Sequence, residues 1–247
     1  MLANRHWRFH QRGQATVEWL YVVPILLILL LGCMQFTFIY EAKQTLNYAT
    51  FVGTRAGALN SGAMAAIQDG LTSGLAPLFS HGEDQQALKD ARLTAKTELA
   101  DAKLAAIAII NPTSSALSGF QNSDGAIPND NLMYRDPTDV QDSMNVQDAN
   151  LLKVRVTYCV RLIVPIVNRM IYAFTVAPPT TPEKIDSTYG GEKIAATDIL
   201  KVSKPGTATG LCVAASNDPY PYRMPITSEA VVRMQTPFKN PGKWVGP

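Results

Sequence analysis

An acidic residue, Glu18, interrupts an otherwise apolar stretch near the N-terminus of this 247-residue chain. It lies five residues after Gly13, behind a basic leader that ends in Arg12, and the 22 residues from Trp19 to Tyr40 carry no charge. A carboxylate at the centre of a membrane-spanning helix is unfavourable by about 2.5–3.5 kcal/mol on insertion scales. Glu18 is therefore interpreted by default as a functional residue.

The spacing of Gly13 and Glu18 behind positive charge is similar to that of a prepilin-peptidase site. Cleavage after Gly13 would leave Gln14 as the mature N-terminus, with its free amine about 6 Å from Glu18 along a helix axis. In a bundle of helices, the amine of a neighbour could pair with Glu18 and offset the unfavourable burial of its charge. The alternative partner of Glu18 is its own N-terminus together with the helix dipole.

Residues 19–40 are long enough to cross a membrane once, because 22 residues span roughly 33 Å as a helix. Arg5, Arg8 and Arg12 precede the span, whereas no basic cluster follows it. The positive-inside rule then places the N-terminus in the cytoplasm and the rest of the chain outside. For a bacterial chain we expect a single-pass protein of the inner membrane with a periplasmic domain, in contact with membrane lipid.

Three other interpretations of the N-terminus stay open. An ordinary single-pass anchor explains the length of the span but leaves Glu18 unexplained. A cleaved secretory signal has a shorter apolar region and an A-x-A-like site, which is missing here. A lipoprotein signal is suggested by residues 30–33, which end in Cys33, although the chain stays apolar up to Tyr40.

The chain divides into a leader (1–13), a transmembrane and extended assembly helix (14–60), and a periplasmic α+β domain (61–247). Pro24 removes one backbone hydrogen bond within the span and permits a kink. Ala49, Gly53 and Gly57 recur every fourth residue, a pattern that lets helix backbones approach closely. This stripe fits contacts with other subunits as well as packing on the chain's own domain.

The rest of the chain predicts one amphipathic helix packed on a small antiparallel sheet. Residues 83–110 show helical periodicity up to Asn111-Pro112, and residues 114–150 are polar and predicted to be an exposed loop. Residues 152–162 alternate like a half-buried strand. Residues 163–176 suggest a second strand or a short apolar excursion, with a lipid surface or a neighbouring subunit as an alternative contact. Further short strands are expected at 194–202, 211–215 and 226–234.

The three cysteines suggest one disulfide. Cys33 lies in the apolar span, whereas Cys159 and Cys212 both fall in the outer region, which is oxidising in a bacterial periplasm. In the predicted strand, Cys159 points with the charged residues, and a thiol on that face is better explained by a bridge than by core packing. Two separately buried thiols are the alternative.

The composition argues against an enzyme. His6 and His10 lie in the leader, which leaves His81 as the only histidine beyond it. That excludes histidine-rich zinc sites and disfavours Ser-His-Asp or Cys-His catalysis. No phosphate-binding glycine loop or G-x-S-x-G motif occurs. Residues 122–130 offer oxygen donors without the spacing of a calcium loop. We therefore expect no catalytic residue, metal or cofactor, and, without a basic stripe bearing aromatics, no nucleic-acid partner.

Taken together, these features resemble the TadE/TadG-like pseudopilins of tight-adherence (Tad/Flp) pilus systems. The resemblance rests on residues 12–18 (RGQATVE), on Pro24, and on residues 53–58 (GTRAGA), with a looser match over 154–158 and 162–165. No large inserted adhesion-type domain is seen, so the chain looks more like the TadE kind. The resemblance implies processing by an inner-membrane prepilin peptidase. It also implies a minor subunit that helps to initiate or cap a pilus with other pilins, an assembly platform and an ATPase.

Overall fold

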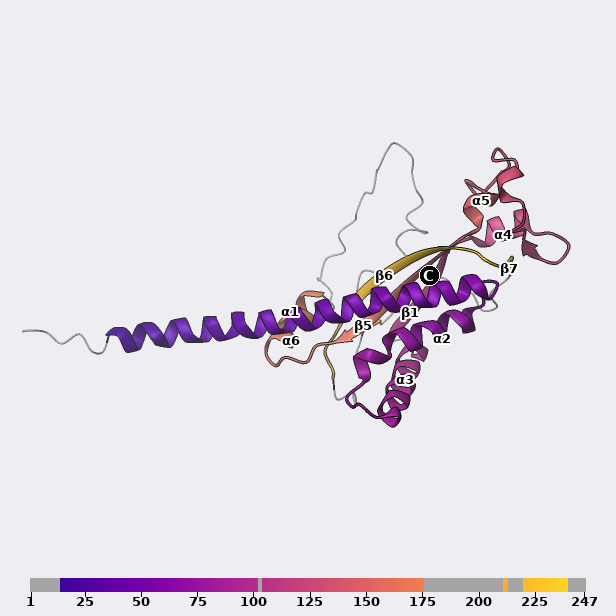
Figure 1. The fold of residues 1–247 in the computed structure, drawn as a ribbon. Coiled ribbons are helices and arrows are strands. Elements are labelled where there is room, and N and C mark those ends of the chain that lie inside the picture. Colours follow the sequence, from indigo (N-terminus) through magenta and orange to yellow (C-terminus); the bar gives the residue numbers. More distant parts are fainter. Residues whose placement is uncertain (1–13, 102–103, 176–210, 213–219, 240–247) are drawn as a thin grey trace, which may run out of the picture.

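The computed structural model describes residues 14–101, 104–175, 211–212 and 220–239. Its first element is α1 (Gln14–Leu59), a helix of 46 residues that is about 69 Å long. The helix continues through Pro24 without ending there. Figure 1 shows that the N-terminal half of α1 projects alone, whereas its C-terminal half lies along the rest of the fold.

The helix α2 (Met64–Leu75) and the 3-10 turn η1 (Ala76–Phe79) fold back along the C-terminal half of α1. The reversal between the two helices needs a glycine, because Gly62 has φ +79° and a Cβ there would lie 2.2 Å from the ring of Phe238. A hydrogen bond of 2.9 Å from Ser61 N to Thr236 Oγ1 ties this turn to the C-terminal part of the domain.

The main sheet has the order β1-β5-β6, with both pairs antiparallel, and consists of β1 (Ala105–Asn111), β5 (Leu151–Arg161) and β6 (Arg223–Arg233). The predicted alternation of residues 152–162 is confirmed in β5, where Leu152, Val154 and Val156 are fully buried. These side chains share one core with the C-terminal half of α1 and with α2. The strand predicted at 226–234 corresponds to β6.

The helix predicted for residues 83–110 is too long. The structure has α3 (Gln85–Ala100) and then the strand β1, which pairs with β5. Residues 105–109 contain alternate buried positions, Ala105, Ile107 and Ile109, and β-branched isoleucine suits a half-buried sheet. The steps of three and four that suggested a helix are therefore overridden by the pairing with β5.

Residues 114–150 were expected to form an exposed loop, and this prediction is wrong. They fold into several short elements: α4 (Ser114–Phe120), β2 (Ala126–Ile127), η2 (Leu132–Tyr134), β3 (Val140–Gln141), β4 (Met144–Asn145) and α5 (Val146–Ala149). Phe120 and Ile127 bury their side chains in the core, and β2 pairs with β7 (Phe238–Lys239). Local side-chain caps hold the two helices, because Thr113 accepts from Ala116 N and Asn145 from Asp148 N.

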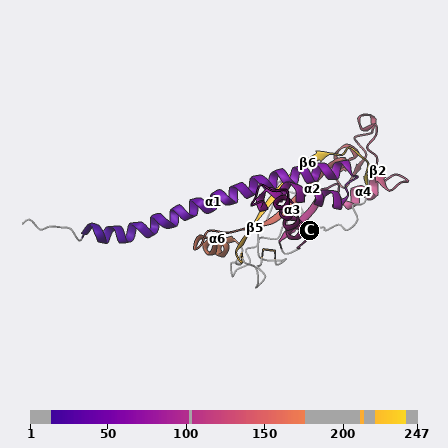
Figure 2. The ribbon, with the colours of Figure 1, turned by 60° about the horizontal axis from the view of Figure 1, so that its bottom comes forward.

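Residues 163–175 do not form the second strand that was one of the two expectations; they include the helix α6 (Val167–Thr175), which contacts β6 and so agrees with the other, a short apolar excursion against the sheet. The strand expected at 194–202 lies outside the described residues, and of residues 211–215 only Leu211 and Cys212 are described, in a turn. The α+β class is confirmed: a long apolar N-terminal helix precedes a domain of helices and small antiparallel sheets. Beside α1, however, two helices of more than ten residues cover the sheet region instead of one. Figure 2 shows both from a second direction.

Candidate functional site

The N-terminal half of α1 is the first candidate, because it has no covering elements. The 43 residues of α1 from Val17 to Leu59 contain a window that is long and apolar enough to cross a membrane. Trp19 is 68% exposed, and most large apolar side chains up to Tyr40 are exposed like it. This surface requires an apolar environment from outside the chain, either lipid or other helices.

Glu18 lies exposed on this uncovered half of α1. Within the part of the chain that the structure describes, its carboxylate has no hydrogen bond or ion pair. Gln14 is the first residue of α1, whereas Gly13 lies outside the described residues. Pro24 is within the helix, about 1.7 turns beyond Glu18. The described residues therefore supply no partner for the ion pair predicted at Glu18.

The stripe of Ala49, Gly53 and Gly57 is occupied by the chain's own domain. A Cβ on Gly53 would lie 2.8 Å from Leu71 Cγ and 2.9 Å from the carbonyl oxygen of Ile67, both in α2. A Cβ on Gly57 would lie 2.6 Å from the side chain of Ile67, and Ala49 is fully buried. Of the two uses that the sequence left open, the structure shows packing of α1 on α2.

The α2 side of this contact was missed at the sequence level. A Cβ on Gly70 would lie 2.7 Å from Gly53 Cα, and one on Gly74 would lie 2.5 Å from Ala49 Cα. The two helices thus touch backbone to backbone through small residues on both sides. The signal was present, since Gly70 and Gly74 are also four residues apart.

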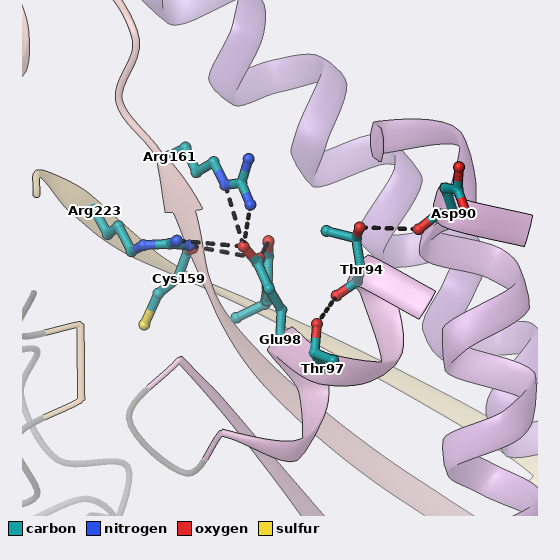
Figure 3. A network of polar contacts seen from close by, with 8 residues as sticks. Asp90, Thr94, Thr97, Glu98, Cys159, Arg161 and Arg223 are labelled. Carbon is teal, nitrogen blue, oxygen red and sulfur yellow. Dashed lines mark hydrogen bonds and ion pairs between the residues drawn. The ribbon is translucent and has the colours of Figure 1, made fainter. Parts of the chain in front are cut away.

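A buried ion cluster links α3 to the sheet (Figure 3). Glu98 on α3 accepts hydrogen bonds from Tyr158 and Arg161 on β5 and from Arg223 on β6, with 3.2 Å between Arg223 Nη2 and Glu98 Oε1. Arg223 also donates to the carbonyl oxygen of Cys159 at 3.3 Å. Glu98, Tyr158 and Arg223 are buried and Arg161 is partly exposed, so the Glu98 carboxylate pairs with one buried and one half-buried guanidinium group.

This cluster is built to hold elements together. Burial, and then the negative charge of Glu98, raise the pKa of the Tyr158 phenol, so that the phenol stays protonated and donates to the carboxylate. The Arg161 guanidinium lies over the rings of Phe79 and Tyr220, at 5.3 and 5.0 Å from their centroids. Tyr158, Arg161 and Arg223 all donate to Glu98, which is the arrangement of a structural clamp.

One feature of the sequence points to this clamp. Glu98 lies three residues after Ala95 and seven after Ala91, on the buried face of an otherwise amphipathic helix. A charge on that face calls for a partner, but the partner Arg223 is 125 residues away in the chain. Its identity depends on the sheet order.

The predicted disulfide is present. Cys159 and Cys212 are bonded, with Cα atoms 5.4 Å apart, inside the limit of about 7 Å for a bridge. Cys159 does point away from the Val154 face, as expected, but it is fully buried under a small second cluster that includes Leu104 and Tyr172. Cys33 is a free, exposed thiol in α1.

His81, the only histidine beyond the leader, lines a pocket of about 320 Å³ between α1, η1 and β5. Within the described residues its imidazole has no hydrogen-bond partner, so nothing there orients it for proton transfer. The same part of the chain holds no group of three or more His, Cys, Asp or Glu side chains suited to a metal ion. In the 122–130 turn, Asn122 Oδ1 accepts from two backbone amides instead.

Comparison with known proteins gives one family. The family model for TadE-like protein matches residues 13–55, which include the predicted cleavage position after Gly13, Glu18, the apolar span and the start of the stripe on α1. No curated protein and no solved structure matches the chain. Over residues 13–55 the chain is therefore similar to the TadE-like family, and the matched segment includes most of the helix that is long and apolar enough to cross a membrane.

Proposed function

We propose that this chain is a minor pilin-like subunit that takes part in initiating or assembling a Tad/Flp-type pilus. In this proposal a prepilin peptidase removes residues 1–13, and the mature chain begins at Gln14. The helix α1 crosses the inner membrane once, with the folded domain in the periplasm. Its partners are other pilin and minor pilin subunits and the inner-membrane assembly platform.

One observation carries the proposal: apart from the contact at Gln35, α1 is covered by its own domain only from Ala42 onwards, and its uncovered N-terminal part bears the single acid Glu18. A simple membrane anchor has no use for a carboxylate in this half, because lipid offers it no partner. A bundle of such helices supplies one, namely the free amine of a neighbouring mature chain. The TadE-like match, which begins at Gly13, supports the same proposal.

The pairing has a plain electrostatic basis. The amine at Gln14 would lie about 6 Å along the axis from Glu18 of its own chain, so a neighbour shifted by roughly one turn brings its amine level with that carboxylate. Away from water the attraction between the two charges is strong, and it offsets the loss of hydration only if both are present. The stripe from Ala49 to Gly57 takes no part, because α2 already occupies it.

Processing is tested by mass spectrometry of the membrane-bound protein in a strain with an active peptidase. We expect an N-terminus at Gln14, and accumulation of the intact chain when Gly13→Ala is introduced. Gly32→Ala is the matched control, because a Cβ at Gly32 would meet no atom within 4 Å. An intact Met1 in the wild type would exclude the pilin-type assignment, and a lipid-modified Cys33 at the N-terminus would replace it with a lipoprotein.

Pairing is tested by Glu18→Ala, with Glu41→Ala as the matched control. Glu41 is also exposed on α1 but lies just beyond the apolar span. We expect Glu18→Ala to leave insertion and cleavage intact and to abolish piliation, whereas Glu41→Ala keeps it. Full piliation with Glu18→Ala would refute the pairing mechanism. It would favour a single-pass periplasmic accessory protein that stays outside the filament.

A further inference from the structure

The helix α6 presents apolar side chains to the outside. Met170 and Phe174, one turn apart on α6, are 46% and 85% exposed, and Ile166, which lies just before the helix with a φ of 68°, is 58% exposed. We call these three residues the α6 stripe. The side of α6 that bears Tyr172 faces the protein, because Tyr172 packs edge-on against Tyr222 with ring centroids 5.4 Å apart, and Val167 is buried at the start of the helix. An amphipathic helix that fixes one face to its domain and leaves an apolar stripe uncovered calls for an apolar contact.

The depth of α6 is set by its contact with α1. Just before the helix, Val164 N donates to Gln35 Oε1 at 2.8 Å, and Gln35 is fully buried by this contact. Gln35 lies inside the uncharged span, five residues before Tyr40, which is about 7–8 Å along the axis. Figures 1 and 2 both show α6 beside α1, at the end of the domain nearest to the projecting half of the helix.

We propose that α6 is an interfacial membrane helix, whose stripe inserts between the headgroups and acyl chains of phospholipids in the leaflet nearest the folded domain. An amphipathic helix of this kind buries its apolar face about 5–10 Å into that boundary, the depth at which Gln35 holds its neighbour Val164. Phe36 and Phe38 on α1 are exposed at the same level, so lipid that surrounds the span also reaches the stripe. The proposal rests only on α1 spanning a membrane and not on assembly of a pilus.

A basic residue at the edge of the stripe fits this placement. Arg169 is exposed next to Met170, and its guanidinium donates to Tyr222 Oη at 2.8 Å and lies over that ring. Arginine at the border of an interfacial helix lies at the level of lipid phosphates. The tyrosine contacts hold it on the same side of α6 as the domain, above the inserted stripe.

The experiment uses the full chain, carrying Cys33→Ser and Phe174→Cys, labelled with the fluorophore NBD. It is reconstituted in phosphatidylcholine–phosphatidylglycerol vesicles that contain lipids spin-labelled at the headgroup or along the acyl chain. Met133→Cys is the matched control, since Met133 is an apolar side chain, 89% exposed, on η2 among the short elements far from α6. We expect quenching at position 174 to be at least threefold stronger than at position 133, and strongest with labels near the headgroup boundary.

Two outcomes would overturn the proposal. Equal, weak quenching at positions 174 and 133 would place the stripe in water. Shielding of position 174 that disappears when the protein is diluted in lipid would instead make it a contact with a second copy. The native chain labelled at Cys33 shows independently whether α1 is inserted in the bilayer, because acyl-chain spin labels quench a fluorophore at that position only when α1 spans the membrane. This measurement distinguishes both outcomes from a protein that has not inserted.

A second variant keeps the test independent of one position. Met170→Cys, labelled in the same way, should show the same quenching, and adding Phe174→Asp should reduce it several-fold. Retention of the Cys159–Cys212 bridge in each variant shows that the domain has folded. Unchanged quenching in the Phe174→Asp variant would refute insertion driven by the stripe.

Discussion

The contact between α1 and α2 can be tested with a single methyl group. In Gly70→Ala the new Cβ would lie 2.7 Å from Gly53 Cα, a backbone atom that cannot rotate away, so the helices must separate by about 1 Å. Overpacking of this kind is unfavourable by about 1–3 kcal/mol, whereas alanine gains up to about 1 kcal/mol of helix propensity over glycine. We therefore expect a net loss of about 1–2 kcal/mol.

For a chain of this length that loss lowers the midpoint of thermal unfolding by roughly 2–8 °C, which circular dichroism of the detergent-solubilised protein can measure. Gly32→Ala in the same molecule is the control. It gains the propensity without a clash, because no atom lies within 4 Å of the new Cβ, and so it leaves the midpoint unchanged or slightly raised. If Gly70→Ala is as stable as the wild type but loses assembly, the small residues serve contacts between subunits and the internal packing argument fails.

Two further predictions concern the sheet. The pKa of Tyr158 is raised in the fold, so its contribution to stability is complete below the ordinary tyrosine value near 10 and is lost as the pH rises above it. Above pH 10 the free energy of unfolding of the wild type should therefore fall more steeply with pH than that of Tyr158→Phe, by roughly 1 kcal/mol per pH unit. Parallel curves for the two proteins would contradict this. Cys212→Ser should destabilise the oxidised domain by about 2–4 kcal/mol in chemical denaturation, because the bridge closes a loop across a sequence separation of 53, and should have no effect under reducing conditions.

Secondary structure and the disulfide were predicted correctly from the sequence where the pattern that indicates them is local. The alternation in β5 gives both its strand and its buried face, and the outward direction of Cys159 pointed to its bridge with Cys212. Residues 105–109 could not be assigned in this way, because alanine and isoleucine there fit a helical and a strand period equally well, and pairing with β5 decided between them. Similarly, the polar segment 114–150 conceals short capped helices around a few buried side chains.

The residues of the candidate site also differ in how far the sequence predicts them. Glu18 and the apolar span can be recognised from the sequence alone, whereas the role of Gly53 depends on which helix lies next to it. A stripe of small residues indicates only that another backbone can approach the helix closely, and the fold alone shows that this partner is α2. The clamp around Glu98 depends on a partner 125 residues away, which no local pattern specifies.

The unbroken course of α1 also sets the reach of the molecule. Beyond Tyr40 the helix continues for 19 residues to Leu59, roughly 28 Å, and the short elements around α4 and β7 lie at that far end (Figure 1). The Debye length at physiological ionic strength is about 8 Å. With α1 spanning a membrane as proposed, charged groups at this end, such as the ion pair of Arg135 and Asp130, are held beyond the electrostatic field of the lipid headgroups.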